Sequence, residues 1–383
     1  MGAAACGLLL AALACAGESA KPPMLVLVGG DAKLWQASCA ERGWQFLDPW
    51  SELHGTTDQR IEALAQAVKQ SPADPNRVYL AAQGNSVSTL LYIASRIPDV
   101  WAAAVAVGGG PRAAIDSNRL FAANTTNLPV LWLFGEKEQE PLGKKLQTAG
   151  FNLEWREAAT AKPADVFEWL ASHTRDPFPS TADCETGSPL FAHCYWLEVT
   201  QFDPAERNDV LDSTRVEPLG SNAELAIGPF GYNMAEAGPG VLVAQLPEKY
   251  SGPLKVNDRI VEMGGKPVKD GTEFAQILYH TFEEKPVIVM VERGKERLRL
   301  ETRIVMAPRA EPVTARVRGQ YLPDLHEVEV VSRAVSQMKV TLPATWLPAK
   351  ISWNGTEVAN ASESGCWLLD EQKELLTARR CQP

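Results

Sequence analysis

RVYLAAQGNSVS, residues 77–88, runs from an apolar segment through a turn of small residues into the start of a helix. Arg77–Ala82 has the length and the apolar character of a buried strand. Val87–Arg96 is the predicted helix, and Pro98 closes it because proline cannot continue a helix. Gly84 lies between the two, where a backbone conformation that strains other residues costs glycine little. The stretch therefore predicts a strand, a sharp turn and a helix.

The same alternation of strand and helix extends over residues 22–175. The other predicted strands are Met24–Val28, Ala102–Gly108, Pro129–Phe134 and Asn152–Glu157, and the other predicted helices are Asp58–Gln70 and Pro163–His173. Asp58 is placed to cap its helix, in which apolar residues recur at helical spacing. Alternation of this kind predicts an α/β domain with a parallel sheet covered by helices on both faces.

This domain resembles the α/β-hydrolase family, especially secreted esterases and polyhydroxybutyrate-depolymerase-like proteins. The resemblance is carried by Arg77-Val78-Tyr79-Leu80, by the small-residue turn, by the helix end Arg96-Ile97-Pro98-Asp99 and by the strand Ala102–Gly109. In that family a serine nucleophile lies at the turn between strand and helix, in the motif G-x-S-x-G. The resemblance implies a serine hydrolase scaffold.

Two registers compete for the nucleophile position. One takes Gly84-Asn85-Ser86-Val87-Ser88 as the motif with its last glycine replaced, which makes Ser86 the nucleophile. The other follows the spacing usual in the family, counted from Arg77 and from Arg96, and places Gly84 at the tip. We favour the second register, in which the nucleophilic oxygen is absent.

The other two members of a hydrolase triad are an acid and a histidine. Glu138, after the strand Pro129–Phe134, matches the acidic position, although a solvated loop charge is the simpler interpretation. Where the family has its histidine, Ala158–Pro163 contains none. His173 lies at the far end of the following helix, roughly 15 Å along its axis, and His54 lies in an earlier loop. A serine without imidazole is a poor nucleophile, so we expect a pseudo-hydrolase; the alternative is a carboxylic ester hydrolase that uses Ser86, Glu138 and an unexpected base.

Residues 223–308 resemble a PDZ domain of the kind found in bacterial envelope proteases. The resemblance is carried by GVLV at 240–243, LKVNDRI at 254–260 and GGKPV at 264–268. Such domains bind an extended peptide as an added strand beside a helix. The resemblance implies that backbone N–H groups of Phe230, Gly231 and Tyr232 take the terminal carboxylate. It also places Phe274, Ile277 and Leu278 near the groove, with at least two of these three expected in the core. The implied partner is the C-terminus of a peptide or protein.

Two further regions complete the chain. Residues 176–222 are expected to form a connector that includes a strand-like run, His193–Val199. Residues 309–383 are β-rich, and Asn354-Gly355 is a strong turn signal. A small module resembling a β-sandwich is predicted there.

Charge and cysteine content limit the choice of partners. The 383-residue chain has a formal net charge of −10, which disfavours nucleic acid and anionic membranes as partners. Neither the cysteines nor the histidines have metal-ligand spacing, so no metal and no cofactor is predicted. Cys184 with Cys194, and Cys366 with Cys381, are close enough in sequence to form disulfides, which would leave Cys39 unpaired.

Residues 1–20 have the pattern of a cleavable export signal. Their apolar run, Gly7–Ala14, is too short to span a bilayer and ends in small residues. Cys15 loosely resembles the lipidated cysteine of bacterial lipoproteins, and contact with a membrane is expected only if Cys15 is lipidated. The sequence therefore predicts an exported protein, periplasmic or extracellular.

Overall fold

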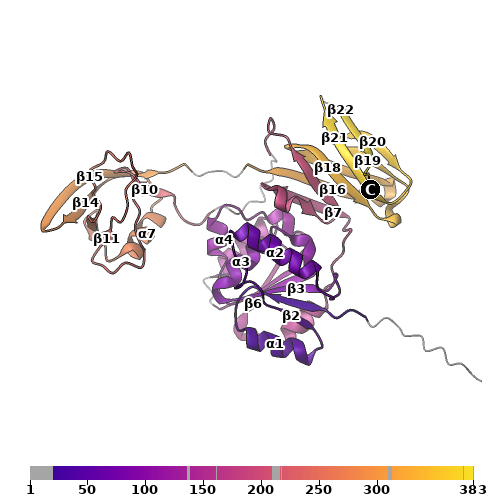
Figure 1. Ribbon diagram of the computed structural model, residues 1–383, viewed down its shortest axis with the longest axis horizontal. Helices are drawn as coiled ribbons and strands as arrows, with labels where there is room; N and C mark the ends of the chain where they lie inside the picture. The colour runs from indigo at the N-terminus through magenta and orange to yellow at the C-terminus, as the bar shows by residue number, and fades with distance from the viewer. Residues whose placement is uncertain are drawn as a thin grey trace, which may run out of the picture.

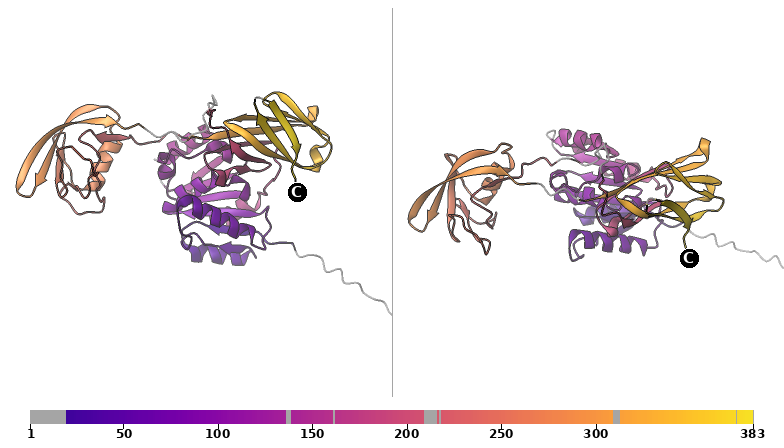
Figure 2. Two further views of the ribbon diagram at one scale, coloured as in Figure 1. Left: turned by 45° about the horizontal axis from the view of Figure 1, so that its top comes forward. Right: turned by 90° about the horizontal axis from the view of Figure 1, so that it is seen from above.

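The computed structural model describes residues 20–135, 139–160, 162–208, 216, 218–308, 313–373 and 375–382. These residues form an α/β domain, a β-sandwich packed against it and a third body set to one side (Figures 1 and 2). Residues 1–19, which include Cys15 and all but the last residue of the predicted export signal, lie outside the described residues.

The α/β domain is built on a six-stranded parallel sheet in the order β2-β1-β3-β4-β5-β6. The strands are β1 Met24–Leu27, β2 Gln45–Leu47, β3 Val78–Gln83, β4 Ala103–Val107, β5 Val130–Phe134 and β6 Leu153–Glu157. Every residue of β1 and of β5 is buried. Such strands have continuous apolar sequences because helices cover both of their faces.

Two groups of helices cover the sheet. The helices are α1 Ala32–Glu41, α2 Thr57–Lys69, α3 Val87–Ala94, α4 Arg112–Asp116, α5 Glu140–Thr148 and α6 Pro163–Ala171. Residues of α1 and α6 share one apolar core with the sheet, and residues of α2, α3, α4 and α5 share the other. The predicted α/β architecture is confirmed.

The sequence prediction missed β2, α1, α4 and α5. Helix α1 shows why, because only Trp35 and Cys39 of its ten residues are buried while Leu34 is exposed. Its apolar stripe is too narrow to show helical periodicity. Cys39 is buried and unpaired, as predicted.

The β-sandwich is assembled from two separate parts of the chain. One sheet has the order β20-β19-β17-β16-β7 and the other β22-β21-β18-β9-β8. The strands are β7 Thr181–Thr186, β8 His193–Cys194, β9 Leu197–Phe202, β16 Ala315–Leu322, β17 Glu327–Arg333, β18 Val335–Leu342, β19 Ala349–Trp353, β20 Thr356–Ala361, β21 Gly365–Gln372 and β22 Leu375–Arg380. Strand β7 pairs with β16, and β9 pairs with β18. The range 176–222 is therefore not a mere connector, because its strands complete both sheets.

The third body is inserted between these two parts of the sandwich, and we call it the inserted domain. Its strands are β10 Ala223–Leu225, β11 Val241–Leu242, β12 Arg259–Met263, β13 Lys266–Pro267, β14 Lys285–Arg293 and β15 Glu296–Met306, and its helix is α7 Gly271–Tyr279. The main sheet has the order β10-β15-β14-β12-β11, and β13 pairs with β12. Leu225, Ile260, Phe274 and Val289 belong to its separate apolar core.

Two disulfides lie in the sandwich among the described residues. Cys184 bonds to Cys194, which joins β7 of one sheet to β8 of the other. Cys366 bonds to Cys381, which ties β21 to the residue that follows β22. Both predicted pairings are confirmed.

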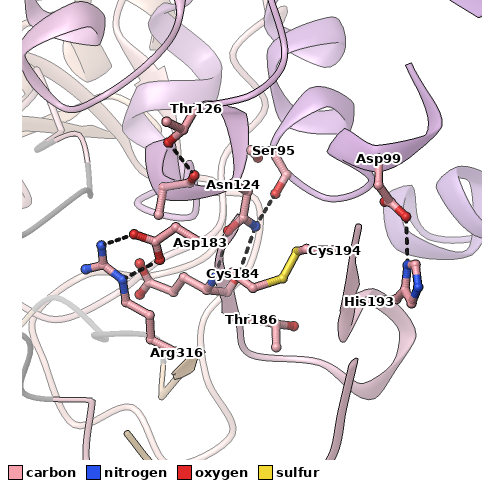
Figure 3. Close-up of a disulfide and its surroundings, with 12 residues drawn as sticks. Ser95, Asp99, Asn124, Thr126, Asp183, Cys184, Thr186, His193, Cys194 and Arg316 are labelled. Carbon is pink, nitrogen blue, oxygen red and sulfur yellow. Dashed lines mark hydrogen bonds and ion pairs between the residues drawn. A yellow bond between two sulfur atoms is a disulfide. The ribbon is translucent and has the colours of Figure 1, made fainter. Parts of the chain in front are cut away.

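Buried polar contacts join the sandwich to the α/β domain (Figure 3). The Asn124 side chain is 2% exposed and donates to the Ser95 carbonyl at 2.7 Å and to the Glu185 carbonyl at 2.9 Å. The Glu185 N–H donates to Asn124 Oδ1 at 2.6 Å. One amide therefore links the end of α3 to strand β7.

The inserted domain contacts the α/β domain through the last residue of α7. The Tyr279 hydroxyl donates to Asp116 Oδ2 at 2.8 Å and accepts from the Arg112 guanidinium at 2.8 Å. Both partners lie on α4. Asp116 Oδ1 also accepts from the Leu219 N–H at 2.7 Å, on the segment that leads into β10. Helix α7 is thus tied to the α/β domain.

Candidate functional site

The turn after β3 lies where a doubly wound sheet usually offers a crevice. The chain passes from β1 outward to β2 and then returns to β3 on the other side, so the strand order reverses between β1 and β3. Gly84 follows β3 directly with φ +63°, in the left-handed region that favours glycine. A Cβ at Gly109 would overlap the Gly84 carbonyl. Gly84 therefore occupies the tip of a tightly packed turn, and the tip carries no side chain.

Ser86 lies two residues beyond this tip, at the end of the 3-10 helix Gly84–Ser86. Its φ of −80° and ψ of −5° are helical and unstrained. Its side chain packs against Gly29 in the loop after β1, where a Cβ would overlap the Ser86 hydroxyl. Within the described parts of the chain, that hydroxyl makes no hydrogen bond.

Two of the histidines, His173 and His193, lie near the amino-terminal ends of the strands, away from the turn after β3. The His173 carbonyl accepts from the Tyr79 hydroxyl at 3.0 Å, and its ring lies 2.8 Å from the Trp169 carbonyl. Tyr79 is near the start of β3, about 16 Å from Gly84 at the usual strand rise. His193 Nδ1 lies 2.7 Å from Asp99 Oδ2 (Figure 3), and Asp99 precedes β4. Neither ring can serve a nucleophile at the turn after β3.

The remaining candidates do not complete a triad. His280 and His326 belong to the inserted domain and the sandwich. His54 is exposed in the loop before α2, and its ring makes no hydrogen bond to any residue that the structure describes. The predicted acid, Glu138, lies outside the described residues. The described residues thus show no serine, histidine and acid brought together.

In the loop predicted to receive a peptide carboxylate, one of the three predicted donors already makes a hydrogen bond within the inserted domain. The Gly231 N–H donates to the Gln245 carbonyl at 2.8 Å, and the Gly231 carbonyl accepts from the Ala244 N–H at 2.8 Å. Gly231 and Gln245 form an antiparallel bridge. The Gly231 N–H therefore faces the neighbouring strand, contrary to its predicted role as a ligand donor.

The backbone N–H groups on either side of Gly231 point away from the strand that contains Gln245. In an antiparallel pair, a residue that exchanges hydrogen bonds with its partner is flanked by residues whose N–H groups point the other way. Phe230 and Tyr232 are those residues, and their N–H groups donate to no residue in the described ranges. Two of the three predicted donors are therefore available on one open edge.

Aromatic rings line this edge. The Phe230 and Tyr232 ring centroids are 5.6 Å apart, and each lies within 6 Å of the Phe274 ring. Phe274 is 2% exposed and belongs to the core, whereas Phe230 and Tyr232 are half-buried. Burial raises the pKa of the Tyr232 hydroxyl, which stays neutral at physiological pH. The edge is a neutral, apolar surface.

Helix α7 forms the other wall. A Cβ at Gly271 would lie 3.0 Å from Met234 Cα and 3.3 Å from the Tyr232 ring, so this face of α7 points at the open edge. Residues four and seven positions later share a helix face, which adds Ala275 and Leu278. Ile277 and Leu278, both predicted near the groove, are half-buried and pack against the core of the inserted domain. Ala275 was not among the residues predicted near the groove, although its helical spacing from Leu278 indicates the same face of α7.

The open edge is short. The chain leaves it after Tyr232 in a turn in which the Glu236 N–H donates to the Asn233 carbonyl at 3.1 Å. Peptide bound there could pair along only a few residues.

None of the helices in the described ranges is long and apolar enough to cross a membrane.

One comparison with known proteins identifies a domain within the chain. A family model of the PDZ domain matches residues 228–304. No curated protein matches the chain. Among solved structures, the chain is similar to a thermostable esterase with a TM-score of 0.29 and 16% identity, over 41% of this chain. The match spans 56% of that esterase. Residues 228–304, at the centre of the inserted domain, are a PDZ domain.

Proposed function

We propose that this chain is an exported, non-catalytic protein that binds the C-terminal ends of peptides or proteins in its PDZ groove. The observation that carries the proposal is the open edge at Phe230 and Tyr232. Their backbone N–H groups lack partners within the described chain, and they lie between half-buried aromatic rings and α7. The terminal carboxylate of a peptide supplies acceptors for such donors, and the side chain of its last residue packs against the apolar wall.

The short edge limits what the groove can recognise. Strand pairing with Phe230 and Tyr232 involves only the end of a ligand, because the chain turns away at Asn233. Recognition therefore depends on the terminal carboxylate and on the side chain of the last residue. Phe274 already fills the floor of the groove, which favours a compact aliphatic side chain at that position.

The turn after β3 supports a scaffold role for the α/β domain. Gly84 at its tip carries no nucleophile, and Ser86 lacks a proton acceptor among the described residues. A serine hydroxyl attacks esters slowly unless a base removes its proton. The two disulfides support export, because such bonds persist in oxidising compartments.

The test is binding of fluorescent peptides with varied C-termini to the full chain, measured by polarisation. Peptides with a free carboxylate should bind, and their C-terminally amidated versions should bind at least about tenfold more weakly. Tyr232→Pro, which deletes one N–H donor, should abolish binding. Tyr232→Phe keeps that donor and the ring, so it should bind normally. Equal binding of the free and amidated peptides would contradict the proposal.

A further inference from the structure

Two adjoining cavities lie on the α/β domain, apart from the PDZ groove. The larger, about 610 Å³, lies among the starts of α2, α3 and α4. The smaller, about 220 Å³, reaches the sandwich segment Thr186–Phe191. Both are lined by Asp58, Tyr92 and Arg119, so they share one polar wall. The larger falls within the usual range of small-molecule pockets, roughly 300–1,000 Å³.

A buried arginine lines the smaller cavity. Arg96 is 6% exposed, and its guanidinium carbon lies 4.4 Å from the centroid of the Tyr92 ring and 4.4 Å from that of Phe121. It donates to the Tyr92 hydroxyl at 3.2 Å and to the Arg119 carbonyl at 2.7 Å. No carboxylate from the described residues forms an ion pair with it. A buried charge of this kind is costly unless an anion balances it.

The charges around this wall suit a ligand that is an anion at one end. Arg119 adds a second, exposed guanidinium. Asp58 supplies the one carboxylate among the lining residues, and its Oδ1 accepts from the Tyr92 hydroxyl at 3.2 Å. Because Asp58 would repel a bare anion but accepts hydrogen bonds from hydroxyl groups, the ligand needs both an acid and hydroxyls.

Hydroxyl groups are available in the larger cavity. Thr57 and Thr89 line it, and neither side chain bonds to another described residue. Tyr92 contributes the edge of an aromatic ring between the two cavities. Arg96 lines only the smaller cavity, Thr57 and Thr89 line only the larger, and Asp58 and Arg119 lie on the wall that the two share. A guanidinium on one side, hydroxyls on the other and both charges between them match a sugar acid.

We propose that the joined cavities bind an anionic sugar of the uronate class. The planar forks of Arg96 and Arg119 take the sugar carboxylate, since guanidinium groups pair with carboxylates in a bidentate manner. Asp58, Thr57 and Thr89 take the ring hydroxyls. This site is separate from the PDZ groove and does not depend on it.

The experiment is calorimetric titration of the full chain with glucuronate, glucose and inorganic phosphate. Glucuronate should bind, and glucose and phosphate should each bind at least about tenfold more weakly. Arg119→Gln should weaken glucuronate binding about tenfold or more. Arg119 is exposed, so this variant should fold.

The matched control is Arg379→Gln, which removes an exposed arginine far along the chain, on β22 of the sandwich. This control should leave glucuronate binding unchanged. Equal affinity for glucuronate and glucose would overturn the role of the arginines. Phosphate binding as tight as glucuronate binding would overturn the sugar assignment. An unchanged affinity in Arg119→Gln would overturn the site.

Discussion

Replacing Asn124 with alanine should loosen the contact between the α/β domain and the sandwich. The side chain makes three hydrogen bonds, two as donor and one as acceptor. Two of them cross the contact to Glu185 on β7, and the third joins the Ser95 carbonyl within the α/β domain. At a net value of about 1 kcal/mol each, their loss costs about 3 kcal/mol of unfolding free energy. The Ser95 carbonyl, the Glu185 carbonyl and the Glu185 N–H would be left without these partners in a buried place, so the cost should not be smaller.

The assay is urea unfolding of the full chain, followed by tryptophan fluorescence. The control is Asn127→Ala, which removes a single bond to the Thr181 carbonyl at 2.7 Å from a half-buried side chain. This control should cost about 1 kcal/mol. If Asn124→Ala cost no more than Asn127→Ala, the buried amide would not be what joins the two parts.

Two further predictions concern pH and the turn after β3. The hydrogen bond to Asp99 raises the pKa of His193 above its ordinary value, whereas burial acts in the opposite direction. The pair therefore stabilises the fold fully below about pH 6.5, the pKa of the unfolded state. This stabilisation is lost as the pH rises through the higher pKa of the folded state. Because the His193 side chain is 57% exposed, Asp99→Asn should lower the free energy of unfolding by only about 0.5 kcal/mol at pH 6. This difference from the parent chain should vanish by about pH 9. A difference that grew with pH in chemical unfolding experiments would refute this prediction. Gly84→Ser should destabilise the chain by about 1 kcal/mol, since the φ of +63° at this position strains any residue with a Cβ. The variant should not hydrolyse p-nitrophenyl esters, because the described residues show no imidazole hydrogen-bonded at the turn. Rapid ester turnover by this variant would refute the scaffold role of the α/β domain.

Local sequence patterns predicted most of the α/β domain. The strands β1, β3, β4 and β5 are short apolar runs separated by turn signals, and this pattern is enough to predict a buried strand. The disulfide partners could also be predicted, because Cys184 and Cys194 are near neighbours in the chain. Asn354 and Gly355 both have positive φ, as the predicted turn requires.

The discontinuous sandwich could not be predicted in this way. Thr186 pairs with Ala315, although the whole inserted domain separates these two residues in the sequence. No local pattern encodes a partner that distant in the chain. Strand β7, with the sequence TADCET, has few large apolar residues and shows no clear strand pattern by itself.

Of the three predicted groove donors, only the Gly231 N–H faces the neighbouring strand instead of the open edge, and the reason is the register of the pairing. A shift of one residue along a strand exchanges the two edges to which N–H groups point. The pairing of Gly231 with Gln245 sets that register, and it depends on tertiary contacts. The sequence therefore identified the loop but not which of its N–H groups face the ligand.

Labelling with a fluorophosphonate probe tests most directly whether the α/β domain is catalytic. We expect no labelling of the full chain at neutral pH, and none of Ser86→Ala or Ser88→Ala. Strong labelling that disappears in Ser86→Ala and persists in Ser88→Ala would show an activated serine and contradict the account.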